Sequence, residues 1–366
     1  MKNLITELSL VLSFILSLSC TNTTENKSTI KVDINQRDDI SLAKMFTKIE
    51  LIPLETTEES IIKSIGGVKY SNKQFYILDF STSSIFIFDD NGNYLSKIDN
   101  HGNGPYEYKN ISDFIINKNQ IELLDPINQS ISKYTTNGVF VEKLKLPTLS
   151  QGTYKSMSIL NEDTIVFWTY DYDNRIKYYS RQKQKIVFEA FPEGKKDIFC
   201  PYEFAAPSYL CRSLNNKVYK LGEKGLTTAY EWDFGKYNNN EKNIKFPKNP
   251  REIPKYVKAC QNSEIVNYIL SGQVKNNNYY YSRITRENKI LHLFYNTQED
   301  KTMLFEKSTE GLSIYPILMD ENIIIGSHFE GKLDEVVNTS ILSETEKSKL
   351  TNHKDDDNQM LIKYYF

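Results

Sequence analysis

The chain has 366 residues, a length that an all-β barrel or propeller can reach as one unit. Its 45 basic and 47 acidic residues leave a net charge of −2, which excludes a surface basic enough for nucleic acid. The 25 Tyr and 19 Phe residues favour pleated sheets over helices. The composition therefore predicts an all-β protein without a DNA or RNA partner.

The first 19 residues have the features of a secretion signal. Lys2 gives a charged start, and the apolar run from Leu8 to Leu18 is too short to span a bilayer as a mature helix. A run that ends just before Cys20 resembles a bacterial lipoprotein signal, in which cleavage leaves this cysteine as the acylated first residue. An ordinary cleaved signal peptide is the alternative. We expect residues 20–39 to form a flexible tether between membrane and domain.

Two stretches of the first half repeat each other without a gap. Asn72 to Ile98 and Lys118 to Leu144 share eight identities in 27 positions, at an offset of 46 residues. A period in the forties with several short strands per unit is typical of propeller blades. The second copy contains four strand-like runs, and Asn137-Gly138 between the last two predicts a tight hairpin turn. Each unit is therefore predicted to be one four-stranded blade.

The segment HGNGPYEY, residues 101–108, connects these two units. A phosphate-binding loop would lead into a helix, whereas a strand follows here, so the sequence favours a structural loop. In that role Gly102 and Gly104 permit unusual φ angles, Pro105 stiffens the crossing, and Glu107 bonds loop amides.

Five side chains are candidates for the ligand-binding face of the propeller: His101, Glu107, Tyr108, Asp79 and Asp125. The first three lie in the connecting segment, which sits on the face where propellers hold ligands around the channel. Each aspartate ends a strand five residues before a serine. A ring of functional carboxylates is one interpretation, but an Asx-type turn that bonds its own loop is more common.

Strand-like runs continue to the C-terminus, and counting them gives six blades. The later units cover Asn161 to Phe191, Leu214 to Gly235, Asn277 to Lys307 and Leu312 to Gly331. Two stretches, Ile253 to Gly272 and Leu333 to Leu350, are predicted as short helical insertions. A propeller must close its ring, because an open blade leaves unpaired strand edges. We therefore predict that the strand-like runs Met45 to Leu54 and Asn358 to Phe366 lie together in the last blade.

The cysteines and histidines do not form a recognisable site. Cys200 and Cys211 are a candidate disulfide in an oxidising compartment, and buried reduced thiols are an equally good interpretation. The four histidines have no metal-ligand spacing, and neither a CxxC motif nor a Gly-x-Ser-x-Gly elbow occurs. The sequence thus predicts no catalytic residue, no metal site and no cofactor.

Four elements together carry a family resemblance: the lipoprotein-type signal, FTKIELIPLETTEES, HGNGPYEY leading into ISDF, and YEWDFGKY. They resemble the six-bladed β-propeller lipoproteins of Bacteroidetes-type bacteria, which are similar to NHL-type propellers. The resemblance covers residues 40–366. It implies one propeller domain in a secreted or envelope-anchored protein, and it implies no reaction.

The leading functional hypothesis is a membrane-anchored, non-catalytic propeller that binds a peptide, protein or glycan of the cell envelope. The alternatives are an envelope enzyme, such as a lyase or glycan hydrolase, and a structural scaffold. The polar segment after Cys20 lacks an acidic run, with Glu25 almost alone beside Lys27. We therefore expect an outer-membrane lipoprotein on the periplasmic face rather than at the cell surface.

Overall fold

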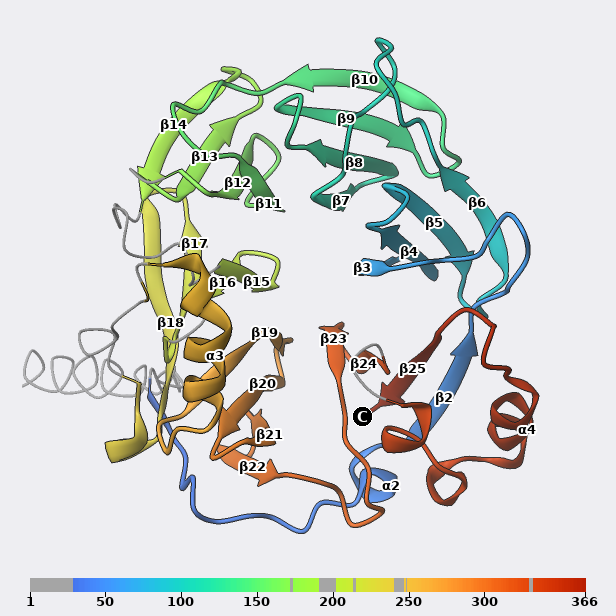
Figure 1. The fold of residues 1–366 in the computed structure, drawn as a ribbon, viewed down its shortest axis with the longest axis vertical. Helices are drawn as coiled ribbons and strands as arrows, with labels where there is room; N and C mark the ends of the chain where they lie inside the picture. Colours follow the sequence, from blue (N-terminus) through green and yellow to red (C-terminus); the bar gives the residue numbers. More distant parts are fainter. Residues whose placement is uncertain are drawn as a thin grey trace, which may run out of the picture.

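Six β-sheets surround a central channel in the computed structural model, which describes residues 29–171, 174–190, 202–212, 215–239, 247, 249–328 and 332–366. Figure 1 looks along the channel, with β3, β7, β11, β15, β19 and β23 around the centre. The protein is a six-bladed β-propeller with a few short helices, as the sequence predicts. Cys20 and Cys200 lie outside the described residues.

The first three blades each contain four consecutive antiparallel strands. Blade 1 consists of β3 (Ile65–Ser71), β4 (Gln74–Asp79), β5 (Ser84–Asp89) and β6 (Tyr94–Ile98). Blade 2 consists of β7 (Asp113–Asn117), β8 (Gln120–Asp125), β9 (Ser130–Thr135) and β10 (Phe140–Lys145). Blade 3 consists of β11 (Tyr154–Ile159), β12 (Thr164–Thr169), β13 (Ile176–Ser180) and β14 (Lys185–Ala190).

The other three blades vary this plan. Blade 4 consists of β15 (Tyr202–Ala206), β16 (Tyr209–Arg212), β17 (Lys217–Gly222), β18 (Gly225–Asp233) and the added β1 (Thr29–Lys31). Blade 5 consists of β19 (Asn267–Lys275), β20 (Tyr279–Arg286), β21 (Lys289–Asn296) and β22 (Lys301–Phe305). Blade 6 consists of β23 (Pro316–Met319), β24 (Ile323–Ser327), β25 (Met360–Tyr365) and β2 (Lys48–Pro53).

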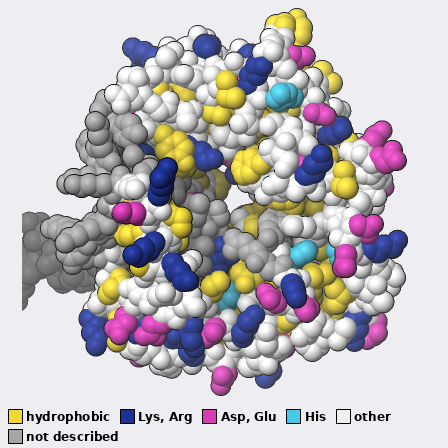
Figure 2. All heavy atoms as spheres, viewed as in Figure 1, with side chains coloured by type: hydrophobic (Ala, Val, Ile, Leu, Met, Phe, Trp, Pro, Cys, Tyr) yellow, Lys and Arg dark blue, Asp and Glu magenta, His cyan; other side chains and the backbone are white. Residues whose placement is uncertain are grey.

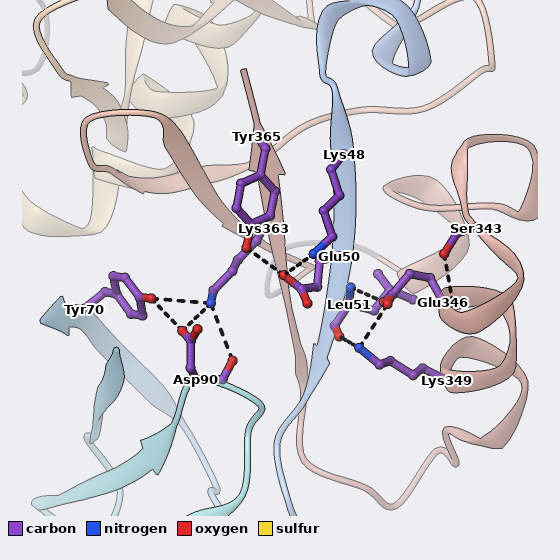
Figure 3. Close-up of polar contacts among 10 residues, drawn as sticks. All are labelled: Lys48, Glu50, Leu51, Tyr70, Asp90, Ser343, Glu346, Lys349, Lys363 and Tyr365. Carbon is purple, nitrogen blue, oxygen red and sulfur yellow. Dashed lines mark hydrogen bonds and ion pairs between the residues drawn. The ribbon is translucent and has the colours of Figure 1, made fainter. Parts of the chain in front are cut away.

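Blade 6 closes the ring with strands from both ends of the chain. β2 pairs antiparallel with β25 from Lys48↔Tyr365 to Pro53↔Met360, so the predicted closure is confirmed. Lys363 of β25 is buried and reaches the carboxylate of Asp90 and the hydroxyl of Tyr70 in blade 1 (Figure 3). The C-terminal strand therefore joins blade 6 to blade 1 through polar contacts as well as through packing.

Residues 29–38, expected to belong to a flexible tether, are attached to the propeller. β1 pairs parallel with β18, and the buried side chains of Ile30, Val32 and Ile34 pack into the core of blade 4. Further on, Asp38 donates its N–H to the carbonyl of Leu304 in β22 and accepts the N–H of the same residue, at 2.8 and 2.7 Å. Alternating apolar residues in the sequence TIKVDI make this attachment possible, and the segment runs along the outer edges of blades 4 and 5 (Figure 1).

The helical segments are shorter than predicted. They are α2 (Leu42–Met45), α3 (Ile253–Gln261), α4 (Glu344–Asn352) and the 3-10 turns η2 (Gly235–Tyr237), η4 (Pro250–Glu252), η5 (Leu333–Glu335) and η6 (Thr339–Ile341). The helix expected over 253–272 is wrong beyond Gln261, because the run from Asn267 pairs with β20 as a strand. Within the described part of the chain, no helix has both the length and the apolar content needed to cross a membrane.

A β-bulge recurs in the outer strands of blades 1, 2 and 3. The ladders skip Leu95, Val141 and Val187, which are spaced 46 residues apart and are 47%, 43% and 45% exposed. The extra residue bends the strand and increases its twist. The sequence repeat therefore extends to blade 3 in structure, although identities are evident only between the first two blades.

Candidate functional site at the channel mouth

We call the face that carries the blade-to-blade crossings the crossing face. The crossing from β6 to β7 and the β4–β5 turn lie on it together, because Ser84 Oγ bonds the Asp99 carboxylate at 3.1 Å and Ser83 Oγ bonds Asn110 at 2.9 Å. This is the arrangement that strand alternation predicts. Figure 2 shows the molecule hollowed at its centre, where the inner strands meet.

Asp79 and Asp125 perform the same structural task in blades 1 and 2. Asp79 accepts the N–H of Lys63 at 2.9 Å, and Asp125 accepts the N–H of Lys109 at 2.8 Å, so each ties its own strand end to the preceding crossing. Within its own turn, Asp79 also accepts the backbone N–H of Ser81, and Asp125 accepts that of Ile127. Both carboxylates are buried and occupied by these bonds. Their predicted role on a ligand face stays a prediction.

The loop 101–108 is held by internal bonds. Glu107 accepts the N–H of Gly104 at 2.6 Å, as expected, and its carbonyl accepts the ammonium of Lys143 in β10. The expected reason for the glycines is wrong, since neither Gly102 nor Gly104 adopts a positive φ. Instead, a Cβ at Gly102 would overlap the Glu107 carboxylate. A larger residue at this position would therefore displace the Glu107 carboxylate.

The other two candidates of this loop differ in their exposure. His101 is exposed, at the start of the loop. Tyr108 is fully buried between blades 1 and 2, where its hydroxyl donates to the carbonyl of Ile98 at 3.2 Å. Burial raises the pKa of Tyr108 well above its usual value. Of the loop candidates, His101 is thus accessible to a ligand, whereas Tyr108 belongs to the core. Exposed Pro105 lies between them.

The inner strands bring together a cluster that sequence reasoning missed. Lys69 of β3 places its ammonium 4.0 Å from the carboxylate of Asp113, the first residue of β7. Asp113 also accepts the N–H of Met157 in β11 at 2.8 Å. One carboxylate therefore connects the inner strands of three successive blades.

Phe80 and Lys155 complete this cluster. Phe80, in the β4–β5 turn of blade 1, lies against Gly66, where a Cβ would overlap its ring. The ring is 45% exposed. The ammonium of Lys155 in blade 3 is 5.9 Å from the ring centre, and in the described residues it has no ion-pair or hydrogen-bond partner. We call Gly66, Lys69, Phe80, Asp113 and Lys155 the mouth cluster.

The charged side chains of the mouth cluster are two lysines and one aspartate, so the cluster itself has an excess of positive charge. Burial raises the pKa of Asp113, against the opposing effects of Lys69, two backbone N–H groups and Lys155. In the described part of the chain, Asp113 thus pairs with Lys69 alone, while the charge of Lys155 also acts on it. No sequence signal identifies this arrangement, because Lys69 and Lys155 lie in different blades and each looks like an ordinary polar strand residue.

A second concavity, of about 390 Å³, lies between blades 2 and 3 on the opposite face. Its charged groups are already paired: Lys118 with Glu162, Lys133 with Glu142, and Arg181 with Glu122. A ligand entering it would have to displace these pairs. The mouth cluster is the better candidate because its Lys155 ammonium and Phe80 ring are available.

No metal site emerges among the described residues, since no three His, Cys, Asp or Glu side chains converge there. Cys211 is buried, and its thiol lies 3.5 Å from the carbonyl of Glu203. Its proposed disulfide partner, Cys200, falls outside the described residues.

Comparisons with known proteins place the chain in a family and support the fold. The crystal structure of a Bacteroides fragilis protein named as a candidate for export is similar, with a TM-score of 0.66, 16% identity, and coverage of 92% of this chain and 98% of that one. A Bacteroides vulgatus member of the duf4221 family is similar with a TM-score of 0.51 and 12% identity, covering 88% of this chain and 96% of that chain. No curated protein sequence matches. A family model described as a domain of unknown function, DUF4934, matches residues 27–365, and the chain belongs to that family.

Proposed function

We propose that this protein is a membrane-anchored, non-catalytic propeller of the cell envelope that binds a peptide, protein or glycan at the mouth cluster. The exposed ring of Phe80 opposite the unpaired ammonium of Lys155 carries the proposal. Binding sites combine an apolar surface with a few polar groups that fix orientation. Most other polar groups that we located on this part of the crossing face are used by the protein itself, as Asp79 and Asp125 illustrate.

The N-terminal sequence supports the location. A secretion signal that ends just before Cys20 would leave an acylated cysteine nine residues before the described domain begins at residue 29. The protein would then be an outer-membrane lipoprotein facing the periplasm. Metabolic labelling with a fatty-acid analogue tests this step, because Cys20→Ala should abolish the label and leave the protein uncleaved. Labelling of the variant equal to that of the wild type would contradict it.

Site-specific photo-cross-linking tests the binding site itself. A photoreactive amino acid replaces Phe80 in the full-length protein, which is expressed in its own cell envelope. The control replaces Val141, which is equally exposed but lies on the outer rim of blade 2. We expect a discrete adduct from position 80 that is absent from position 141 and is lost in a Lys155→Ala background. The same products from both positions would contradict a binding site at the mouth.

A further inference from the structure

We propose that the ligand of the mouth cluster is an acidic glycan, with a uronic-acid ring against Phe80 and its carboxylate paired with Lys69 and Lys155. This inference rests on the proposed function, because it names the ligand class of the same site. It is carried by three features: the excess positive charge that the inner strands place at the mouth cluster, its exposed aromatic ring, and the engagement of N–H groups of the neighbouring turns by Asp79 and Asp125.

The charge of the channel strands favours an anion. The six inner strands carry three lysines, at positions 69, 155 and 275, and two carboxylates, at positions 113 and 203, in a protein whose net charge is −2. Lys275 is buried beneath Tyr209 and Tyr280, toward the opposite face. Glu203, on blade 4, has interactions of its own. From the inner strands, Lys69 and Lys155 thus provide two positive charges at the mouth against the single carboxylate of Asp113, and the buried carboxylates of Asp79 and Asp125 beside it accept backbone N–H groups.

The pair of Lys69 with Asp113 is loose enough to accept a second anion. At 4.0 Å and with a partly exposed lysine, such an ion pair contributes little to stability. Asp113 keeps two shorter bonds to backbone N–H groups, of Phe114 and Met157, at 2.8 Å each. An incoming carboxylate can therefore approach Lys69 while Asp113 remains in place.

The aromatic plane favours a sugar ring beside that carboxylate. Phe80 contacts Gly66 and remains 45% exposed, and the Lys155 ammonium lies over its ring at 5.9 Å from the ring centre, so a sugar that packs on the ring meets this ammonium. One face of a pyranose ring consists of C–H groups, which pack on an aromatic ring. A uronic acid presents its carboxylate at the edge of the same ring, next to that apolar face.

A peptide fits the surroundings less well. Peptide recognition commonly uses backbone hydrogen bonds as well as side-chain pockets. Asp79 and Asp125 engage several N–H groups of the segments that flank the mouth in blades 1 and 2, including those of Ser64 and Asn128. Recognition at this site therefore depends on side chains, which suits a sugar.

Calorimetric titration of the full-length protein tests the inference with a hexuronic-acid oligomer and its methyl ester. The ester keeps the sugar rings and removes the charge. We expect the ester to bind at least tenfold more weakly than the acid, and affinity for the acid to fall as salt is added. Lys69→Gln and Lys155→Gln should each weaken binding of the acid at least tenfold, whereas Asp113→Asn should strengthen it.

The matched control is Lys97→Gln, because Lys97 lies at the crossing-face end of the outer strand β6 and pairs with Asp99 at 3.5 Å. It should bind the acid as the wild type does, and a thermal melt of each variant shows that it is folded. Equal affinities for acid and ester, or unchanged affinity in both lysine variants, would overturn the inference. Binding of an oligoglutamate in place of the uronic-acid oligomer would overturn the glycan assignment.

The two proposals fail in distinguishable ways. If the photoreactive residue at position 80 forms its specific adduct but the uronic-acid oligomer does not bind, the acidic-glycan inference is wrong and the binding site remains. If position 80 behaves like position 141 and no oligomer binds, both proposals are wrong.

Discussion

The side-chain carboxylate of Glu346 accepts a hydrogen bond of 2.6 Å from the backbone N–H of Leu51 (Figure 3). Lys349, one turn further along α4, donates at 2.9 Å to the carbonyl oxygen of the same residue. Leu51 lies in β2, the outermost strand of blade 6. Two side chains of the helix thus satisfy the outward-facing backbone groups of an edge strand, which would otherwise be open to pairing with another chain.

Replacing Glu346 by Ala tests the importance of this contact. The variant leaves the buried N–H of Leu51 without an acceptor, so we expect the free energy of unfolding to fall by about 1–3 kcal/mol. Denaturant titration measures the change. The control is Glu344→Ala, since Glu344 has a side chain 89% exposed and, among the described residues, forms its one ion pair with Lys347 of the same helix. Equal losses in the two variants would show that the contact to Leu51 contributes nothing specific.

Removal of Leu361 to Phe366 tests the closure of the ring. The truncation deletes nearly all of β25, which lies between β24 and β2 and supplies buried residues of the blade 6 core. We expect the truncated chain to lose cooperative unfolding, as followed by thermal melting with circular dichroism. A variant with only Phe366 removed keeps every β25 pairing and serves as the control. A melt of the truncated chain like that of the full-length protein would refute closure by this strand.

The bulges provide a further test of edge protection. The outer strands of blades 5 and 6 are regular, and the chain itself covers them: Asp38 bonds to the outer strand of blade 5, and α4 bonds to that of blade 6. The outer strands of blades 1 to 3 instead carry a bulge. Deleting Val141 would make the ladder of β10 continuous, because Phe140 and Glu142 already pair with Tyr134 and Lys133. We expect this deletion to increase aggregation, measured by light scattering at equal concentrations. Val141→Ser keeps the bulge and should scatter light as the wild type does. If this variant aggregates as much as the deletion variant, the bulge is not protective.

Much of the fold was predictable because it depends on local patterns. The 46-residue repeat predicted the blades, and Asn137-Gly138 predicted a hairpin in which Gly138 adopts a φ of 79°, with Gly92 at 88° in the equivalent turn of blade 1. The need to cover strand edges predicted that the two ends of the chain meet. The strand β1 was missed although apolar residues alternate in TIKVDI, because residues 20–39 were interpreted as a polar tether. The helix expected over 253–272 was too long because a short apolar run does not distinguish a helix from a buried strand.

The mouth cluster could not be predicted for a different reason. Asp113, Lys69 and Lys155 are brought together by the ring arrangement of the blades, and nothing in their sequence neighbourhoods marks them. The residues that did attract attention, such as Asp79 and Glu107, stand in recognisable turn sequences because they hold those turns. Prominent turn motifs here indicate structural bonds, whereas the available ammonium group of Lys155 comes from a plain strand position.

Buried His292 makes the stability of blade 5 sensitive to pH. Its Nδ1 lies 2.9 Å from the hydroxyl of Tyr281, and its Nε2 is buried without a hydrogen-bond partner in the described residues. Burial, together with the charges of Arg283 and Lys307, lowers the pKa of His292 to about 3. The ring therefore stays neutral in the folded protein at pH values where an exposed histidine becomes charged.

This shift destabilises the folded state in acid. In the unfolded chain His292 has a pKa of about 6.5, so below that pH the unfolded state binds a proton that the folded state does not. The contribution of His292 to the free energy of unfolding has its full value above about pH 6.5. It falls as the pH drops toward 3, by up to about 1.4 kcal/mol per pH unit. Between pH 7.5 and 5.0 the loss amounts to about 2 kcal/mol.

His292→Phe should remove this part of the pH dependence. Phenylalanine fits among Tyr281, Phe305 and Tyr315, and the Tyr281 hydroxyl keeps the carbonyl of Ile314 as an acceptor at 3.2 Å. Denaturant titrations at pH 7.5 and 5.0 give the change in unfolding free energy for each protein, and other titrating groups cancel between them. We expect the change to be about 2 kcal/mol smaller in the variant, whereas His101→Phe, at an exposed position, should retain the wild-type difference. If His292→Phe also retains it, His292 must be protonated as readily in the folded protein as in the unfolded chain, which would mean that water reaches this part of blade 5.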